Sequence, residues 1–223
     1  MLRITIMSKT NRSKITKKEA AEILDLLKEE YPEAGCALHY DSPYHLLLAV
    51  MLSAQTTDVS VNKITPELFR RFPEPEDLAA ASQDEVIDII RSIGLYKNKS
   101  KNIISMSQVL MEKYDGVVPG DFKKLTELPG VGRKTANVVL AEGFGEQRIA
   151  VDTHVFRVSN RIGLSNSESV LETEKQLMAV LPEKRWTEAH HLLIFHGRRC
   201  CSARKPQCNR CPILEHCRHP EIL

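Results

Sequence analysis

The stretch that decides the fold is Leu125-Thr-Glu-Leu-Pro-Gly-Val-Gly-Arg-Lys-Thr-Ala-Asn-Val-Val139. Asp121 can cap a short helix before it, and Pro129 ends that helix at the preceding residue. Gly130 and Gly132 allow the positive φ angles of a very tight turn. A second helix is expected to begin at the second of these glycines or one residue later. The stretch therefore predicts two helices joined by a hairpin.

The hairpin loop is suited to bind an anion. Its backbone N–H groups, from Gly130 to Gly132, lack intrahelical partners and lie at the positive end of the second helix dipole. The simplest anion of this kind is a phosphate. For the pattern P-G-x-G alone, an ordinary corner between two helices is an equally good interpretation.

Lys134 stands in the first turn of the second expected helix. The helix dipole disfavours a cation there, and an acidic residue would be the usual choice. A lysine held at this end should lose its proton more easily, and a neutral amine is a nucleophile that forms Schiff bases. Without further evidence, a surface lysine that touches phosphate as a point charge is the simpler interpretation.

An aspartate opens another expected helix in the segment Ile149-Ala-Val-Asp-Thr-His-Val-Phe-Arg-Val158. Asp152 is expected to be the N-cap of that helix. A carboxylate fixed at such a position could also stabilise positive charge that develops on a sugar, as one carboxylate does in glycoside hydrolysis.

The two segments together resemble the helix-hairpin-helix DNA glycosylases, and within them the endonuclease III family. The motifs L-P-G-V-G-R-K-T-A-N and V-D-T-H-V-F-R-V carry the resemblance, which extends from about residue 15 to residue 217. It implies that Lys134 is the catalytic nucleophile and that Asp152 is the second catalytic residue. It also implies DNA contacts at Gln55, Leu95, Lys97, Pro129, Gly130, Val131, Gly132, Arg133, Thr135 and His154.

The sequence predicts an all-α fold, because no strand pattern or internal repeat occurs. The resemblance implies two helical lobes with the DNA groove and the active site between them. The expected divisions are a mobile basic arm at 1–14, an amino-terminal helix at 15–35 that packs with the carboxy-terminal lobe, a lobe at 36–148 with the hairpin at about 121–142, and the carboxy-terminal lobe at 149–223.

Other helices follow from apolar periodicity and from capping signals. Capping boxes are expected at Thr16 with Glu19 and at Ser82 with Glu85. The expected helices are 16 to a stop at Pro32, 45–54, 59–72, 82–93, 99–114, 153–161, 169–180 and 187–197.

Two turns beside these helices carry exposed candidates for DNA contact. Leu52-Ser-Ala-Gln-Thr-Thr-Asp58 turns polar after an apolar helix, for which a capped junction is the simpler interpretation. Ile93-Gly-Leu-Tyr-Lys-Asn-Lys99 places Leu95 among lysines, although a single exposed leucine usually has no function. The resemblance implies that Gln55 enters the space left by an extruded nucleotide. It also implies that Leu95 is a wedge in the base stack while the lysines hold phosphates.

Five of the six cysteines lie between Cys200 and Cys217, which predicts a metal centre in a reducing compartment. Zinc ribbons favour two short cysteine pairs with a longer spacer. Spacings of six, two and five residues would instead wrap one compact cluster, so chemistry alone only slightly favours iron and sulfur over zinc. The resemblance implies a 4Fe–4S cluster held by Cys201, Cys208, Cys211 and Cys217.

Composition sets further limits. The 223 residues are 42% hydrophobic, enough to bury a sizeable core. No apolar run has the length of a membrane span and no signal segment follows the first methionine, so a cytoplasmic, nucleoid-associated location is expected. The net charge of +2 is small, but basic residues gather at 3–18, 91–101 and 198–218. Such clustering would present a basic face to a polyanion.

The sequence therefore predicts a monomeric, bifunctional DNA glycosylase and abasic-site lyase that acts on damaged pyrimidines in double-stranded DNA. Two alternatives compete with it. A monofunctional adenine glycosylase of the same superfamily would lack the lysine at 134 and would carry a glutamate at the position of Ala49. A non-catalytic DNA-binding or redox-sensing module would need neither Lys134 nor Asp152.

Overall fold

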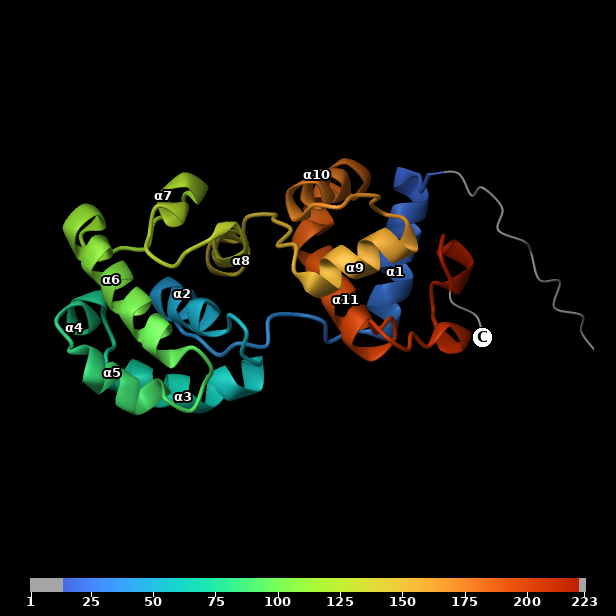
Figure 1. Cartoon of the computed structure of the whole chain (residues 1–223). Helices are drawn as coiled ribbons and strands as arrows, with labels where there is room; N and C mark the ends of the chain where they lie inside the picture. The colour runs from blue at the N-terminus through green and yellow to red at the C-terminus, as the bar shows by residue number, and fades with distance from the viewer. Residues whose placement is uncertain (1–13, 221–223) are drawn as a thin grey trace, which may run out of the picture.

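The computed structural model describes residues 14–220, and within them every regular element is a helix (Figure 1). The predicted all-α fold is confirmed. The expected basic arm lies outside the described residues except for its last position. No described helix is long and apolar enough to cross a membrane.

Each expected helix is present, with small differences at the ends. The helices are α1 (Lys17–Glu30), α2 (Pro43–Leu52), α3 (Asp58–Arg71), α4 (Pro75–Ala79), α5 (Gln83–Ile90), α6 (Tyr96–Tyr114), α7 (Phe122–Thr126), α8 (Arg133–Phe144), α9 (Thr153–Ile162), α10 (Val170–Val180) and α11 (Trp186–Arg199). Short 3-10 turns follow at η1 (Glu183–Arg185), η2 (Cys208–Arg210) and η3 (Leu214–His216).

The sequence missed one helix and one helix start. The missed helix is α4, which has five residues and is too short for apolar periodicity, although Glu74 and Asp77 form a capping box around it. The missed start is that of α6, which begins at Tyr96 instead of residue 99 because Leu95 precedes it with a left-handed φ of 60°. No side chain caps α6, so no capping signal was available in the sequence.

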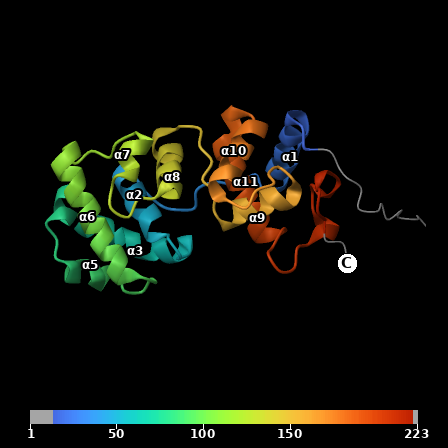
Figure 2. The ribbon, with the colours of Figure 1, turned by 45° about the horizontal axis from the view of Figure 1, so that its top comes forward.

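Buried apolar side chains form two clusters. The first is drawn from residues 38–140 and surrounds α2, whose residues from Tyr44 to Leu52 are all buried. The second joins α1 to side chains between residues 149 and 213. In Figures 1 and 2 the helices α2 to α8 lie together, and α1 lies beside α9, α10 and α11. We propose that each cluster is the core of one lobe, with the division near residues 148 and 149.

Thr16 and Glu19 meet at the start of α1, where a capping box was predicted. Thr16 Oγ1 accepts a hydrogen bond from Glu19 N at 3.2 Å, as expected. The carboxylate of Glu19 also accepts a hydrogen bond from Arg218 at 2.7 Å and lies 3.5 Å from His216. Burial raises the pKa of Glu19, but hydrogen bonds from Arg218, His216 and the backbone of Thr16 lower it overall. Glu19 therefore ties the start of α1 to the end of the chain.

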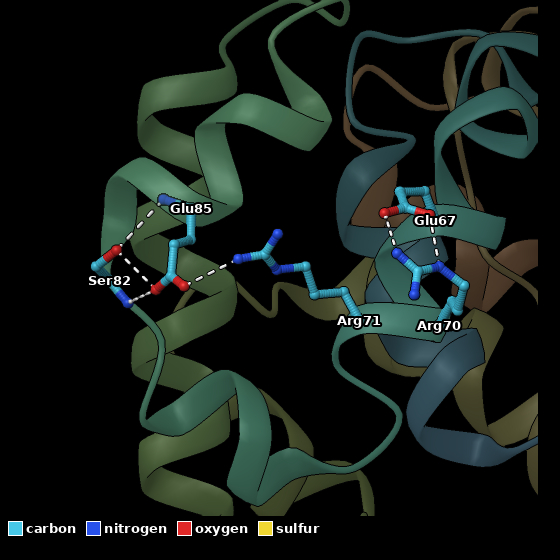
Figure 3. A network of polar contacts seen from close by, with 5 residues as sticks. All are labelled: Glu67, Arg70, Arg71, Ser82 and Glu85. Atoms are coloured by element: carbon cyan, nitrogen blue, oxygen red, sulfur yellow. Dashed lines mark hydrogen bonds and ion pairs between the residues drawn. The ribbon is translucent and has the colours of Figure 1, made fainter.

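The second predicted capping box is confirmed at α5 (Figure 3). Ser82 Oγ accepts from Glu85 N at 3.3 Å, and Glu85 Oε2 accepts from Ser82 N at 3.0 Å. Arg71, at the end of α3, donates to the other oxygen of Glu85 at 3.0 Å. These bonds hold the pKa of Glu85 below its usual value, first through the backbone of Ser82. Beside them, Glu67 and Arg70 pair within α3.

Polar side chains also connect the two groups of helices. Each connection joins α3 or α8 of the first group to α10 or α11 of the second. The pairs are Arg133 with Glu174, Asp58 with Arg198, and Glu142 with His191. These three pairs therefore join the two groups of helices through α8 and α3.

Candidate active site and nucleic-acid interface

Gly130 makes the hairpin turn. Its φ is 77°, which confirms the predicted left-handed conformation. A Cβ at this position would lie 2.9 Å from Asn102 Cβ and 3.0 Å from Met51 Cε. Only glycine therefore fits, both for its backbone angle and for the space around it. The next residue, Val131, is buried and donates its N–H to Leu128 O at 3.1 Å, which closes the turn.

Gly132 differs from the prediction. Its φ of −91° and ψ of 176° are those of extended backbone, so the expected positive φ is wrong. The reason is that Gly132 is already the N-cap of α8, where extended backbone is usual. No side chain caps this helix, and a Cβ on Gly132 would meet no atom within 4 Å. The first N–H groups of α8 therefore have no side-chain cap among the described residues, and they lie at the positive end of the helix dipole.

Lys134 lies in the first turn of α8, as predicted, and its side chain is exposed. Within residues 14–220 its amine has no hydrogen-bond or ion-pair partner. Thr135 beside it is half-buried. The amine is therefore available to a molecule that binds at the hairpin.

Asp152 is the N-cap of α9, as predicted. Its Oδ1 accepts hydrogen bonds from His154 N and Val155 N, both at 2.8 Å. Among the residues that the structure describes, none donates to Oδ2. One oxygen thus fixes the carboxylate and the other is left for an external group.

A buried histidine, His190, is influenced by both Lys134 and the segment that leads to this aspartate. Burial lowers the pKa of His190 to about 3, and the charges of His191 and Lys134 lower it further, while a hydrogen bond with the backbone of Ala150 acts the other way. Lys134 and the chain two residues before Asp152 therefore both lie around His190. Its Nδ1 is buried and lacks a partner within the described chain. Sequence reasoning did not single out His190; its only signal is a histidine pair inside an apolar helix.

A cleft lies beside the site and brings two predicted DNA contacts together. Gln55 and His154 both line it, and burial lowers the pKa of His154. Asp58 and Arg198 also line the cleft and form an ion pair, with Asp58 Oδ2 3.3 Å from Arg198 Nη1. The sequence did not assign these two residues to the site. The other lining residues are Ala37, Thr56, Thr57 and Val59.

Gln55 and Leu95 share a backbone feature. Their φ angles are 54° and 60°, in a region that costs about 1–2 kcal/mol for residues other than glycine. The other such residue in the described chain is Asp115, which caps the end of α6. Both predicted contacts are exposed, Leu95 by 51%. Residues held in sparsely populated backbone regions gather at functional sites, which agrees with the roles predicted for these two.

The lysines beside Leu95 do not behave alike. Lys97 is exposed, as a phosphate contact requires. Lys99 is buried, with 6% of its surface accessible, and donates to Thr56 Oγ1 at 2.7 Å. The expectation that Lys99 also holds a surface phosphate is therefore wrong, because the start of α6 turns its side chain inward.

Arg133 has a protein partner. Its guanidinium donates two hydrogen bonds, of 2.8 and 2.6 Å, to the buried carboxylate of Glu174, and it lies 4.9 Å from the centre of the Phe122 ring. The pair joins the start of α8 to α10. A DNA contact by Arg133 stays a prediction, as do the contacts expected at Pro129 and the other hairpin residues.

The carboxy-terminal cysteines surround one cavity. It is lined by the four predicted ligands Cys201, Cys208, Cys211 and Cys217, and also by Cys200, His196 and Arg161. Arg161 donates to Cys201 Sγ, and a ring nitrogen of His196 lies near Cys211 Sγ, each at 3.6 Å. Such donors stabilise anionic sulfur. Burial raises the pKa of the Cys211 thiol to about 12. A bound metal cation would lower this pKa and deprotonate the thiol.

The donor set therefore fits a metal centre, with one difference from the predicted ligands. The ligand atoms of His196, Cys200 and Cys211 lie within 4.8 Å of one another. Cys200 was expected to stand outside the centre. Its neighbour Cys201 lines the same cavity. That Cys201, and not Cys200, is the first of the four cysteine ligands along the chain therefore stays a prediction.

The fold and the site define a class of protein. The family model of the HhH-GPD superfamily of base excision DNA repair proteins matches residues 48–183, which include the hairpin, Lys134 and Asp152. The chain belongs to this superfamily.

Its similarity to particular members extends over most of the chain. Endonuclease III of Bacillus subtilis is 50% identical over 87% of this chain and 90% of the relative. Endonuclease III of Escherichia coli is 45% identical over 93% of this chain and 98% of the relative. A solved endonuclease III structure, a trapped covalent intermediate with DNA, is 49% identical with a TM-score of 0.86 and covers 91% of this chain and 96% of that one.

Proposed function

We propose that the chain is a monomeric DNA glycosylase and abasic-site lyase that removes damaged pyrimidines from double-stranded DNA in the nucleoid. The observations that carry this proposal are an available amine at the start of α8 and an available carboxylate oxygen at the start of α9. Lys134 offers an amine without a protein partner, and Asp152 offers a carboxylate oxygen that is likewise free within the described residues. The endonuclease III relatives, one of them trapped in covalent linkage to DNA, support it.

The first step is extrusion of the damaged nucleotide. The sugar C1′ cannot be reached inside a stacked duplex, and a damaged base costs less to unstack than an intact one. Leu95 presses into the base stack, and Gln55 fills the space that the nucleotide leaves. The open N–H groups at the start of α8 hold a phosphate and fix the position of the strand.

The second step replaces the glycosidic bond at C1′ by a bond to Lys134. The neutral amine of Lys134 bonds to C1′, and the base leaves with the electron pair of the glycosidic bond. Asp152 takes part in deprotonating the amine and stabilises the positive charge that develops on the sugar. Its cap bonds to His154 and Val155 hold the carboxylate in place for both roles.

The third step cleaves the strand. Opening of the sugar ring gives a Schiff base between Lys134 and C1′, which acidifies the proton on C2′. Loss of this proton forms the C2′–C3′ double bond, and the 3′ phosphate leaves with the electrons of the C3′–O bond. Water then releases the enzyme from the Schiff base.

We also propose that the metal centre is a 4Fe–4S cluster held by Cys201, Cys208, Cys211 and Cys217. Its role is structural, because it folds a loop that carries basic residues toward the DNA backbone. Iron and sulfide analysis of the purified protein tests the cluster type. We expect Cys201→Ser to abolish the visible absorbance of the cluster and Cys200→Ser to preserve it; the reverse result would exchange the first ligand.

Strand nicking tests the function against its alternatives. A duplex with one thymine glycol should be nicked by the wild type, but not by Lys134→Gln. Lys113→Gln is a matched control, since Lys113 is exposed at the far end of α6. Base loss without nicking would indicate a monofunctional glycosylase, and binding without base loss would indicate a binding module. Position 49, where the adenine-specific relatives carry glutamate, is a fully buried alanine in this chain and therefore offers no acid.

A further inference from the structure

Lys99 is a buried lysine without a carboxylate partner. It lies in the first turns of α6 with 6% of its surface accessible. Its Nζ donates to Thr56 Oγ1 at 2.7 Å, and no ion pair of Lys99 occurs within residues 14–220. Burial accordingly lowers its pKa. An ammonium group thus bears a desolvation cost for a hydrogen bond to one neutral hydroxyl.

The hydrogen bond connects the turns that contain Gln55 and Leu95, two residues with positive φ. Thr56 directly follows Gln55, and the backbone N–H of Lys99 donates to Leu95 O at 2.9 Å. Lys99 therefore contacts the Leu95 turn through its backbone and the Gln55 turn through its side chain.

The Leu95 turn has a second support from α5. Gln83 Nε2 donates to Lys97 O at 2.9 Å and to Ser100 Oγ at 3.0 Å. Ser100 is fully buried and donates its own hydroxyl to Lys97 O at 2.9 Å. These bonds fix the Leu95 turn on the first core, so it is a rigid base from which Lys99 can position another segment.

The Gln55 turn is tied at its end to α11 through Asp58 and Arg198, but the bonds that Thr56 makes apart from that with Lys99 are weaker support. The N–H of Thr56 donates to Ser53 O at 3.0 Å, and its hydroxyl lies 3.5 Å from Ala54 O. Both bonds are local and reach no other helix. The bond from Lys99 is the contact through which Thr56 is held against α6.

We propose that Lys99 is a positioning residue that fixes the separation of Gln55 and Leu95, so that both side chains enter the base stack at the same step. This inference rests on the proposed function. Replacing buried Lys99 and half-buried Thr56 by apolar side chains of similar shape should be close to neutral for stability. The bond therefore contributes to the placement of the turns more than to the folding of the lobe.

Hydrogen exchange of the free protein tests the coupling without reference to activity. We expect Lys99→Met and Thr56→Val to lower the protection of amides in residues 53–58, and the double variant to equal either single one. Thr56→Ser keeps the hydroxyl and Lys113→Met removes a remote charge, so both should match the wild type. Wild-type protection in Lys99→Met would overturn the proposal.

Base extrusion is the functional readout. With 2-aminopurine beside a thymine glycol, stopped-flow fluorescence should show that extrusion is slowed about tenfold in Lys99→Met and in Thr56→Val. This factor corresponds to the loss of one hydrogen bond to a charged group. The slope of log Kd against log salt should stay that of the wild type. A slope reduced by about one would show that Lys99 contacts a phosphate and would contradict the proposal.

The two proposals fail in different ways. If the wild type extrudes no base and cannot be trapped on an abasic site, the proposed function fails, whereas hydrogen exchange still decides whether Lys99 couples the two turns. If the wild type extrudes the base and Lys99→Met does so equally fast, the positioning role fails and the proposed function stands.

Discussion

Arg133 and Glu174 form a two-bond ion pair that ties the hairpin to α10. The side chain of Glu174 is 6% exposed and that of Arg133 is 46% exposed, so the two partners differ in their surroundings. The hydrogen bonds to Glu174 raise the pKa of Arg133, which keeps its guanidinium charged. The residue next to Lys134 is thereby anchored to the opposite group of helices.

This asymmetry predicts unequal effects of the two single substitutions. Arg133→Met leaves a buried carboxylate unpaired and should lower the free energy of unfolding by about 2 kcal/mol, a value reduced by the partial exposure of the pair. Glu174→Gln leaves only a half-exposed arginine and should have a smaller effect. Urea unfolding of both variants measures the difference, and equal losses would contradict the anchoring role.

Asp152 has two roles that substitutions can separate. Asp152→Asn keeps an oxygen that can cap α9, so unfolding should change by less than about 0.5 kcal/mol. The lost charge should slow single-turnover base excision by about a hundredfold or more. Asp152→Ala should lose the cap as well, which costs about 1 kcal/mol. Excision by Asp152→Asn at the wild-type rate would remove the carboxylate from the mechanism.

The glycines of the hairpin provide a second pair of matched variants. Gly130→Ala should destabilise the protein by about 1–3 kcal/mol, because its φ is positive and its Cβ would meet Asn102. Gly132→Ala should leave stability nearly unchanged, because its backbone is extended and its surroundings are open.

The same pair tests the phosphate site when DNA affinity is measured. A methyl group on Gly132 would add bulk at the N-cap of α8, next to the N–H groups proposed to hold a phosphate, so affinity for an abasic-site duplex should fall even though the fold is intact. Unchanged affinity of a stably folded Gly132→Ala would show that no phosphate approaches there.

Local signals made much of this fold predictable. Pro129 and Gly130 predicted the hairpin turn, Asp152 predicted the N-cap of α9, and Ser82 with Glu85 predicted the capping box of α5. Each of these residues acts on backbone within three residues of itself. Leu95 gave no such signal, since a left-handed leucine breaks the usual preference of its residue type.

The residues that the sequence missed act over long separations. Glu174, His190 and Arg198 meet their partners across 40 or more positions, and no local pattern encodes such contacts. The misjudged Lys99 is similar: a basic run predicts a solvated surface, whereas the packing of α6 against the Gln55 turn decides which lysine is buried.

The buried His190 predicts a pH dependence of stability. Its folded pKa of about 3 lies below the ordinary value near 6.5. Between these values the unfolded chain binds a proton that the native protein does not, so stability falls as the pH falls below about 6.5. His190 alone contributes a slope of up to about 1.4 kcal/mol per pH unit.

Urea unfolding at pH 7 and pH 5 measures this contribution. His190→Gln should show a weaker loss of stability on acidification than the wild type. His39→Gln is the control, because His39 is exposed and should leave the dependence unchanged. A His190→Gln variant that loses as much stability as the wild type would show that His190 is protonated in the native protein.

Borohydride trapping tests the central claim most directly. The protein is incubated with a duplex that carries one thymine glycol, reduced, and examined for a covalent complex beside Lys134→Gln and Lys113→Gln. We predict a complex with the wild type and with Lys113→Gln, and none with Lys134→Gln, since only Lys134 forms the Schiff base that borohydride reduces. A complex that persists at wild-type level in Lys134→Gln, or a wild type that cannot be trapped on either thymine glycol or an abasic site, would contradict the assignment of Lys134 as the nucleophile.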